Sequence, residues 1–477
     1  MLLASIVAPL ITAPLLLATK DWRKGGFIAV SSLILAISIM VPEAIKAYEG
    51  FSNREVYDIE PTLYLITLEG DGFNVIYALT VLIICTFSVI YASSYMYHFE
   101  NPSVFLALYL VASSSLVGVV LSGSLTTFFL FYEFFLIPSW LLLLYWGGTE
   151  AKSISFKYLL FTEAGALVTM AGIALIYDQY HTLAFVELKE VLKNAVPSDV
   201  IAPLSLLIAG PLVKSALFPL HAWLPDAHSE APTPVSIQLT LAVGIGNWAL
   251  TKILLFSAPD AFEVSPLRTT LMVMAAVTMI YGSLAALSQR DIKRVLAFSS
   301  VSQSGYALLG ITSGAEVGIA SAAFMFIAHS IAKSLLFMVS GCIERETNTR
   351  LIDKLGGLAD RMPLAAISAF IGFLCLSGIP PTLGFWAELE IFFGVFTTSL
   401  NSGYFGFIMG IVLLVSSTLT AAYGLSTFKK VFYGTTKGFE THENRLSIIQ
   451  IAPLVLALLL IVLGTYPSLI VDLCFRY

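Results

Sequence analysis

Charged side chains are scarce in this sequence. Only 12% of its 477 residues are Asp, Glu, Lys or Arg, whereas 57% are hydrophobic, and the mean hydropathy is +0.87. A soluble fold of this length would need much more polar surface to face water. The composition therefore excludes a water-soluble globular protein and indicates an integral membrane protein.

Motifs for cofactor chemistry are also lacking. The four cysteines stand alone, with no CxxC pair that could hold an iron–sulfur cluster. No GxGxxG follows a strand pattern, and GPLVKS (210–215) lacks the second glycine of a phosphate loop. His221 and His228 are seven apart in a proline-rich turn, which is a poor spacing for zinc or haem without further ligands. We therefore expect no cofactor, no metal and no catalytic chemistry of the chain's own.

Long hydrophobic runs occupy almost the whole chain. A membrane-spanning helix needs about 20 mainly apolar residues, and fourteen runs approach or exceed that length. They cover residues 2–19, 26–45, 72–97, 103–121, 123–145, 157–177, 200–221, 233–257, 268–288, 295–313, 316–342, 363–390, 402–428 and 446–470. The second run is the weakest, because Pro42 and Glu43 interrupt its end. The first run lacks a basic leader and a convincing cleavage site, so we interpret it as a retained span.

Positive charges are unevenly divided between the predicted loops. If all fourteen runs cross, the loops after odd-numbered spans carry 16 Lys and Arg residues and the other side carries six. Basic loops tend to stay in the cytoplasm. The sequence thus predicts one multi-pass domain over residues 1–477 in the cell membrane, with both termini outside. The polar connections at about 46–71 and 178–199 are too short to fold alone, and 185–194 is interpreted as an amphipathic connector or a short surface helix.

A small group of ionisable residues lies within the predicted spans. One such residue at the bilayer centre costs about 2.5–3.5 kcal/mol, so several in one bundle require a common explanation. For any single residue, a structural ion pair or a side chain that reaches the membrane surface is the alternative. The candidates are Glu133, Glu163, Lys214, His221, Lys252, His329, Lys333 and Glu388.

Prolines stand close to three of these charges. Glu133 and Lys214 are each followed five residues later by a proline, and SGIPPTLG (377–384) precedes Glu388. Proline lacks an N–H and removes the helical hydrogen bond to the carbonyl four residues earlier. A broken helix within a membrane is tolerated where protein or a water-filled cavity satisfies the backbone. We therefore predict a helix break and local hydration beside each of the three charges.

Two pairs of basic residues have a helical spacing. His329 and Lys333 are four apart and share one helix face, while Lys214 and His221 are seven apart and would align if their helix continued. Burial favours a neutral lysine, and a nearby carboxylate favours the charged form. At about 7 Å and an effective dielectric near 20, that attraction is on the order of 2.4 kcal/mol. Movement of Glu133 relative to Lys214 could thus switch the lysine between holding and releasing a proton.

The motifs around these residues resemble a known family. The stretches 214–236 (KSALFPLHAWLPDAHSEAPTPVS) and 290–306 (RDIKRVLAFSSVSQSGY), with YEFFLIP in span five and HSIAKSLLF in span eleven, resemble the antiporter-like subunits of Mrp-type (multiple resistance and pH) sodium/proton antiporters, respiratory complex I and membrane-bound hydrogenases. The resemblance covers about residues 70–430. It implies an all-α membrane protein with two inverted five-helix repeats, at 103–257 (spans 4–8) and 268–428 (spans 9–13), and broken helices in spans 7 and 12.

The resemblance also implies roles for single positions. Glu133 and Lys214 match the family's paired carboxylate and lysine, His329 and Lys333 match its central polar axis, and Glu388 matches its terminal charge. The expected proton path comprises Glu133, Lys214, His221, Lys252, His329, Lys333 and Glu388, with Glu163 and His228 as additional candidates.

The sequence departs from the family pattern at three points. The family often has a lysine or histidine in the middle of span eight, where this chain has only Ile245 to Asn247. Lys252, about two turns later, is either its substitute or a residue at the membrane surface. Glu163 stands where the family leads us to expect an apolar or amide residue, and it could be an extra proton or sodium ligand. The end at Tyr477, without a long lateral helix, resembles the shorter type of member.

The combined expectation is a subunit that moves protons through buried charges and water, driven by partners. The resemblance implies other antiporter-like subunits, small membrane subunits and a redox module as partners within the lipid bilayer, with no nucleic acid. Sodium coupling, the energy source and the transport direction are left open. The alternatives are an enzyme or cofactor-bearing subunit, a stand-alone secondary transporter and a structural membrane scaffold.

Overall fold

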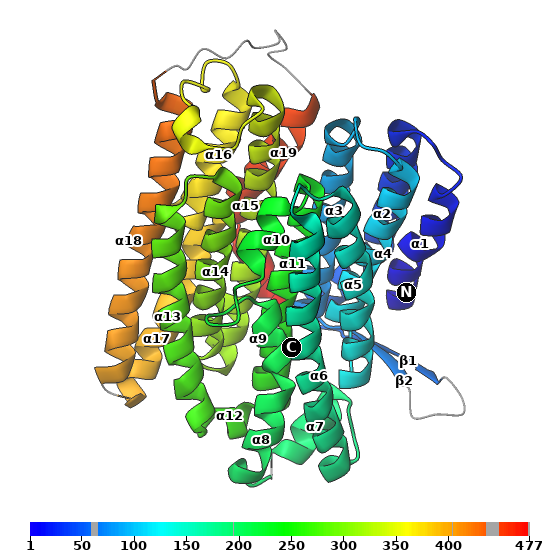
Figure 1. Cartoon of the computed structure of the whole chain (residues 1–477). Coiled ribbons are helices and arrows are strands. Elements are labelled where there is room, and N and C mark those ends of the chain that lie inside the picture. The colour runs from blue at the N-terminus through cyan, green and yellow to red at the C-terminus, as the bar shows by residue number, and fades with distance from the viewer. Residues whose placement is uncertain (59–64, 194, 403, 436–447, 476–477) are drawn as a thin grey trace.

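The computed structural model is a bundle of long helices with one small β-hairpin (Figure 1). It describes residues 1–58, 65–193, 195–402, 404–435 and 448–475. The helices are α1 (Leu2–Leu16), α2 (Trp22–Tyr48), α3 (Gly72–Tyr95), α4 (Pro102–Val120), α5 (Leu125–Trp146), α6 (Ala151–Tyr180), α7 (Phe185–Leu192), α8 (Pro197–Leu207), α9 (Ala209–Lys214), α10 (Leu224–Glu230), α11 (Thr233–Thr251), α12 (Pro259–Glu263), α13 (Pro266–Ser288), α14 (Ile292–Ile311), α15 (Ala315–Thr347), α16 (Pro363–Leu376), α17 (Leu383–Ser402), α18 (Tyr404–Tyr433), α19 (Ile451–Thr465) and α20 (Ser468–Phe475). A π-helical turn, η1 (Lys252–Ser257), follows α11, and η2 (Ile352–Lys354) and η3 (Ile448–Gln450) are 3₁₀ turns.

Many of these helices have the length and composition of membrane spans. Within the described residues nine helices qualify, or ten if the pair α19 and α20, bent by 74°, counts as one span. Three other predicted spans contain the shorter apolar helices α1, α8 and α16. The multi-pass architecture is therefore confirmed, and the count of fourteen remains a prediction. Helix α2 continues through Pro42 to Tyr48, so the proline does not end the second span.

A β-hairpin interrupts the expected all-helical fold. Strands β1 (Asn53–Asp58) and β2 (Leu65–Gly70) pair antiparallel, with Asn53 opposite Gly70. The hairpin lies against the start of α5, where the Thr67 amide donates to the Thr127 hydroxyl at 2.9 Å. This docking satisfies a backbone donor that a plain loop would leave to water. The 185–194 connector contains α7, which buries Phe185, Leu188 and Leu192, so the short-helix alternative is correct.

Two of the predicted spans are broken next to a charge. Helix α9 ends at Lys214 and α10 begins at Leu224, while α16 ends at Leu376 and α17 begins at Leu383. Both breaks confirm the prediction from the prolines. Because α9 ends at Lys214, this lysine and His221 do not lie on one continuous helix, and the alignment expected from their spacing does not occur.

The break expected beside Glu133 is wrong. Helix α5 continues from Leu125 to Trp146 through Pro138. A single proline removes one N–H, and the neighbouring hydrogen bonds of a long helix can hold the backbone together. Glu133 therefore lies on a continuous helix rather than at a helix end.

Helices α11 and α15 form the centre of the bundle. Their most apolar windows are 94% and 100% buried, respectively, with η1 included in the α11 span. In Figure 1 the N-terminal helices α1 to α5 lie on one side of α11, and α13, α14, α17 and α18 lie on the other. Polar side chains in the middle of α11 and α15 are thus enclosed by protein, which is the setting for the site described next.

Candidate functional site

The Lys214 amine is enclosed by aromatic rings. The residue is 2% exposed, and its Nζ lies 5.1 Å from the ring centroid of Tyr132, 4.7 Å from that of Phe135 and 5.6 Å from that of Tyr158. The amine also lies 3.5 Å from the Tyr158 hydroxyl oxygen, which is 2.8 Å from Ser139 Oγ. Aromatic faces attract a cation, so this pocket, built by α5, α6 and α9, tolerates the charged as well as the neutral amine.

The structure brings two acids to this pocket. Glu133 on α5 and Glu163 on α6 are both half-buried. The Glu133 carboxylate interacts electrostatically with Glu163 and with Lys214, and its Oε1 has no hydrogen-bond partner among the described residues. Two carboxylates this close repel each other when both are charged, and the Lys214 amine lies beside them as the opposite charge. Glu163, unusual in sequence, therefore belongs spatially to the Glu133–Lys214 pair.

His221 lies within the break itself. It is 8% exposed, its Nε2 is 3.1 Å from the Tyr281 hydroxyl of α13, and its ring stacks on Phe218 with centroids 5.5 Å apart. The histidine therefore contacts α13, on the side of the C-terminal helices.

Helix α15 carries the central basic pair. Lys333 is fully buried, and its amine donates to the Leu296 carbonyl of α14 at 2.6 Å and to the Ser299 hydroxyl. His329, one turn earlier, is 6% exposed, and its Nε2 has no hydrogen-bond partner in the described chain. The two side chains interact electrostatically. His329 and Lys333 thus lie together in the buried middle of the bundle.

His228 extends this axis toward α10. It is fully buried and stacks on Phe337, with ring centroids 4.8 Å apart. Neither ring nitrogen has a hydrogen-bond partner among the described residues. The imidazole interacts electrostatically with Lys333 and with Lys293. His228 consequently lies between Lys333 and Lys293, the second of which falls between the predicted spans 268–288 and 295–313.

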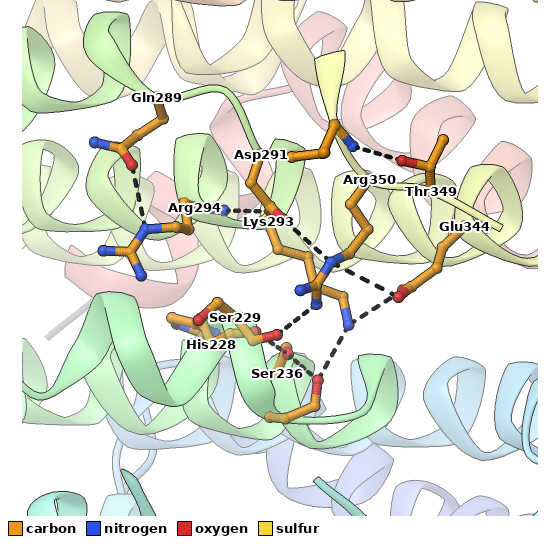
Figure 2. Close-up of polar contacts among 12 residues, drawn as sticks. His228, Ser229, Ser236, Gln289, Asp291, Lys293, Arg294, Glu344, Thr349 and Arg350 are labelled. Atoms are coloured by element: carbon orange, nitrogen blue, oxygen red, sulfur yellow. Dashed lines mark hydrogen bonds and ion pairs between the residues drawn. The ribbon is translucent and has the colours of Figure 1, made fainter. Parts of the chain in front are cut away.

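Lys293 is the main residue that the sequence interpretation missed. Figure 2 shows it with Glu344 and Arg350 over the end of α10. Lys293 is 2% exposed, lies 3.5 Å from Glu344 and donates to the Ala231 carbonyl at 3.1 Å. Arg350 donates to the Ser229 carbonyl at 2.6 Å and pairs with Asp291 at 3.1 Å. These contacts anchor the broken segment α10 to α14 and α15. The sequence signal that would have revealed Lys293 is Ser300 and Ser304, which follow it by seven and eleven positions and so share its helix face.

Lys252 lies away from the Lys214 pocket and from the His329–Lys333 pair. The residue is 2% exposed and begins the π-helical turn η1. Its amine lies 2.6 Å from Asp71 Oδ2 and 3.2 Å from Glu69 Oε2, and 4.4 Å from the Phe256 ring centroid. The sequence left two alternatives for Lys252, a residue at the membrane surface or a proton carrier. The geometry adds a third, a buried ion pair with Glu69 of the hairpin and with Asp71 at the start of α3.

Glu388 lies beside the second break. Ser417 of α18 donates to its Oε2 at 2.7 Å, while its Oε1 has no hydrogen-bond partner in the part of the chain described. Gly378, in the break, has φ +62°, and a Cβ built there would lie 2.5 Å from the Glu388 carboxyl carbon. The backbone of the break thus lies close against this acid.

Comparisons with known proteins identify the family to which the chain is similar. The family described as "NADH:quinone oxidoreductase/Mrp antiporter, TM" matches residues 122–417. The NAD(P)H-quinone oxidoreductase chain 4-3 of Nostoc sp. is 36% identical over 340 residues, which cover 70% of this chain and 60% of that protein, less than two thirds of its length. The F(420)H(2) dehydrogenase subunit M of Methanosarcina mazei is 30% identical over 484 residues, covering 98% of this chain and 95% of that protein.

A solved structure shows the same fold over the whole chain. A chain in the structure of the Mrp complex from Dietzia sp. DQ12-45-1b superposes with a TM-score of 0.90 at 22% identity, covering 100% of this chain and 97% of that chain. At this identity the likeness establishes the fold alone. Together with the family match and the 30% identity across almost the full length, it shows that the chain belongs to the NADH:quinone oxidoreductase/Mrp antiporter family of membrane proteins.

Proposed function

We propose that this chain is the proton-translocating, antiporter-like subunit of a multi-subunit membrane complex. The observation that carries the proposal is the placement of Lys214, an amine 2% exposed at the end of a broken helix, with an acid on the neighbouring α5. Placing an ionisable group inside a membrane bundle costs free energy, and such groups are usually functional. A proton path gives it one.

The pocket geometry supports a switch between two states of the lysine. When the Glu133 carboxylate is close and ionised, it stabilises a proton on Lys214; when it moves away or takes up a proton from Glu163, the buried amine releases that proton. The released proton passes toward His329 and Lys333 and from there to His228 or Glu388. The electrostatic interactions of His329 and of His228 with Lys333 support the middle of this order.

The finer topology is also part of the proposal. We infer fourteen crossings with two inverted repeats over 103–257 and 268–428, supported by the matching breaks beside Lys214 and before Glu388. We further infer that both termini are outside and that the basic loops are cytoplasmic. In support, the hairpin, α7 and α12, all connections after even-numbered spans, lie toward one end of the bundle (Figure 1).

The partners are proposed from the relatives. The names printed for them are a quinone oxidoreductase chain, an F(420)H(2) dehydrogenase subunit and an Mrp complex. We propose that the chain works beside other antiporter-like and small membrane subunits, with a redox module where the complex is respiratory. The half-buried Glu133–Glu163 pair is the place where sodium would compete with protons, because carboxylate oxygens are preferred ligands of hard cations.

The proposal is tested with the complex purified from its own membrane and reconstituted into liposomes. Proton movement is followed with a pH-sensitive dye while the natural energy source, a redox substrate or a sodium gradient, is supplied. Loss of proton movement in Lys214→Ala with normal assembly supports the proposal. Full transport by Lys214→Ala and Glu133→Ala complexes would indicate a structural scaffold, and robust transport by the chain alone would indicate a stand-alone carrier.

A further inference from the structure

Two buried hydroxyl groups lie behind the Lys214 amine. Tyr158 of α6 and Ser139 of α5 are both 0% exposed. The Tyr158 hydroxyl oxygen lies 3.5 Å from Lys214 Nζ and 2.8 Å from Ser139 Oγ. Ser139 Oγ in turn lies 2.9 Å from the Leu136 carbonyl oxygen of its own helix. The four groups thus form one chain of contacts that starts at the amine and ends at a backbone carbonyl.

The end of this chain fixes the direction of each hydrogen bond in it. A carbonyl oxygen only accepts, so the single hydroxyl proton of Ser139 is donated to Leu136. Tyr158 must then donate its own proton to Ser139, and its oxygen is left to accept from the Lys214 amine. Because a backbone carbonyl does not take up a proton near neutral pH, the chain is a dead end for proton transfer. The two hydroxyl groups therefore act on the amine and do not carry its proton away.

Packing holds the Tyr158 ring in place. The ring lies against that of Trp223, with centroids 5.1 Å apart, and the Trp223 indole N–H donates to the Val213 carbonyl at 3.0 Å. Val213 directly precedes Lys214 on α9. The tyrosine is therefore tied to the same helical turn that carries the amine, so its hydroxyl keeps its place when the Glu133 side chain moves.

This arrangement favours the protonated lysine. A protonated amine has three donors and no acceptor, and a hydrogen bond from a charged donor is stronger than one between neutral groups. The neutral amine also carries a lone pair, which Tyr158 cannot satisfy because its proton is committed to Ser139. The hydroxyl chain thus opposes burial, which favours the neutral amine.

Other titratable groups lie on the elements around the amine. They are Glu133 and Tyr132 of α5, Glu163 of α6, Asp199 at the exposed start of α8 and His221 in the break. Helix α11, which packs against α9, carries no ionisable residue between Thr233 and Thr251. Glu133 interacts electrostatically with the amine, and Glu163 interacts with Glu133. Tyr158 and Glu133 therefore stabilise the same proton from two sides, and the effect of Tyr158 persists when Glu133 is neutral.

We propose that Tyr158, oriented by Ser139, is a positioning residue that holds the Lys214 amine in place and stabilises its proton. The inference rests on the proposed function for its effect on transport, and it extends the switch to two residues without a charge of their own. The Glu133 charge is the variable part of this switch, and the hydroxyl chain is its fixed part. Tyr158 thus sets how readily the lysine gives up its proton once Glu133 is neutral.

The first test is the pH dependence of proton transport by the reconstituted complex. On the alkaline side the rate falls when the amine no longer takes up a proton. Tyr158→Phe makes the protonated amine less stable, so it is expected to move this fall toward lower pH by about one pH unit. Ser139→Ala is expected to move it less in the same direction, because Tyr158 can then turn its proton toward the neutral amine. An unmoved profile in both variants overturns the inference.

Tyr77→Phe is the matched control. Tyr77 of α3 is also 0% exposed, and its hydroxyl donates to the Ala322 carbonyl at 3.0 Å, outside the Lys214 pocket. Its loss removes one buried hydrogen bond without touching the amine, so the wild-type pH profile is expected. An equal shift in Tyr77→Phe and Tyr158→Phe would be a general effect of destabilisation and overturns the inference. If Tyr158→Phe does not assemble, Ser139→Ala decides, because it removes a single oxygen that does not contact the lysine.

The second test locates the amine and needs no transport. A cryo-electron microscopy map of the purified wild-type complex is expected to show the Lys214 side chain directed at the Tyr158 hydroxyl. A map of the Tyr158→Phe complex is expected to show the side chain turned away or spread over several positions. A wild-type amine directed away from Tyr158, or an unmoved amine in the variant, overturns the positioning role.

Lys214→Ala separates this inference from the proposed function. If Lys214→Ala abolishes transport while Tyr158→Phe and Ser139→Ala keep the wild-type pH profile, the inference fails and the proposed function stands. If Lys214→Ala transports normally, the proposed function fails, and the effect of Tyr158 on transport fails with it. Shifted profiles in both hydroxyl variants, with an unshifted profile in Tyr77→Phe, support the inference.

Discussion

The Lys252 amine lies 2.6 Å from Asp71 Oδ2, and both residues are almost inaccessible to solvent. This ion pair joins the π-helical turn after α11 to the first turn of α3, and Glu69 of β2 completes it at 3.2 Å. A buried charge that has two opposite charges beside it stays ionised, whereas a proton carrier must change its charge. The geometry therefore favours a structural role for Lys252 over the proton path.

Replacement of Lys252 separates these two roles. Lys252→Arg keeps a permanent positive charge, so we expect near-normal proton transport. Lys252→Met leaves the buried Asp71 and the partly buried Glu69 without a positively charged partner and should destabilise the chain by about 3–5 kcal/mol, as loss of one member of a buried pair does. Thermal unfolding of the purified complex measures the second effect. Loss of transport in a stable Lys252→Arg complex would return this lysine to the proton path.

Lys214→Ala should abolish proton translocation and leave assembly intact. The amine is the only ionisable group of α9, and its removal leaves an apolar helix end among aromatic rings. The measurement is dye-detected proton uptake by liposomes, with subunit composition checked by gel electrophoresis. Lys214→Arg is the informative partner, because arginine keeps the charge but cannot release its proton, and it should be equally inactive. Activity in either variant contradicts the switch.

Glu133→Gln should change the pH dependence of transport. The substitution keeps the shape of the side chain and removes the charge that stabilises a proton on Lys214. Transport rates are compared between wild type and variant across the pH range in which the complex is stable. Glu163→Gln, on the facing helix, is expected to produce a smaller change, since its effect reaches Lys214 through Glu133. Two unaltered pH profiles would show that the acids and the lysine are not coupled.

Gly378→Ala should disturb the acid at the second break. Alanine in the left-handed conformation costs about 1–2 kcal/mol, and its Cβ would lie 2.5 Å from the carboxyl carbon of Glu388. The carboxylate must move, which breaks its hydrogen bond from Ser417. We expect reduced transport and a lower melting temperature. Gly410→Ala is the control, because its Cβ meets Phe396 at 3.3 Å and nothing closer; equal behaviour of both variants would count against a role for the break.

The helix breaks show how far local sequence carries the fold. Pro219 and the prolines at 380 and 381 predicted the ends of α9 and α16 correctly, because a missing N–H near a charge weakens a helix locally. The same argument failed at Pro138, where α5 is continuous. Packing against the neighbouring helices decides whether a weakened helix bends or breaks, and that information lies outside the local sequence.

In the candidate site, too, local sequence predicted some neighbours and only the tertiary structure revealed the others. His329 and Lys333 were placed on one face from their spacing alone, and the structure has them on one continuous helix. Lys293 was counted as a loop charge, yet it is buried beneath Arg350 and Glu344 (Figure 2). Glu163 was an oddity in sequence, and its contact with the Glu133 pocket depends on α6 facing α5. Spacing reveals neighbours within one helix, whereas neighbours on different helices require the tertiary arrangement.

The sequence by itself determined that the chain is an integral membrane protein and which segments are long and apolar enough to cross the membrane. It also determined which ionisable residues lie within those segments, where their burial costs free energy. These properties follow from the free energy of transferring side chains between water and lipid, which composition and segment length set. Only the tertiary structure decided which charges are paired, as Lys252 is, and which lie beside a neutral hydroxyl group, as Lys214 does. Those outcomes depend on atoms brought together from distant parts of the chain. If one helix shifted by a single turn against its neighbour, a side chain would lose its partner and face an empty space instead.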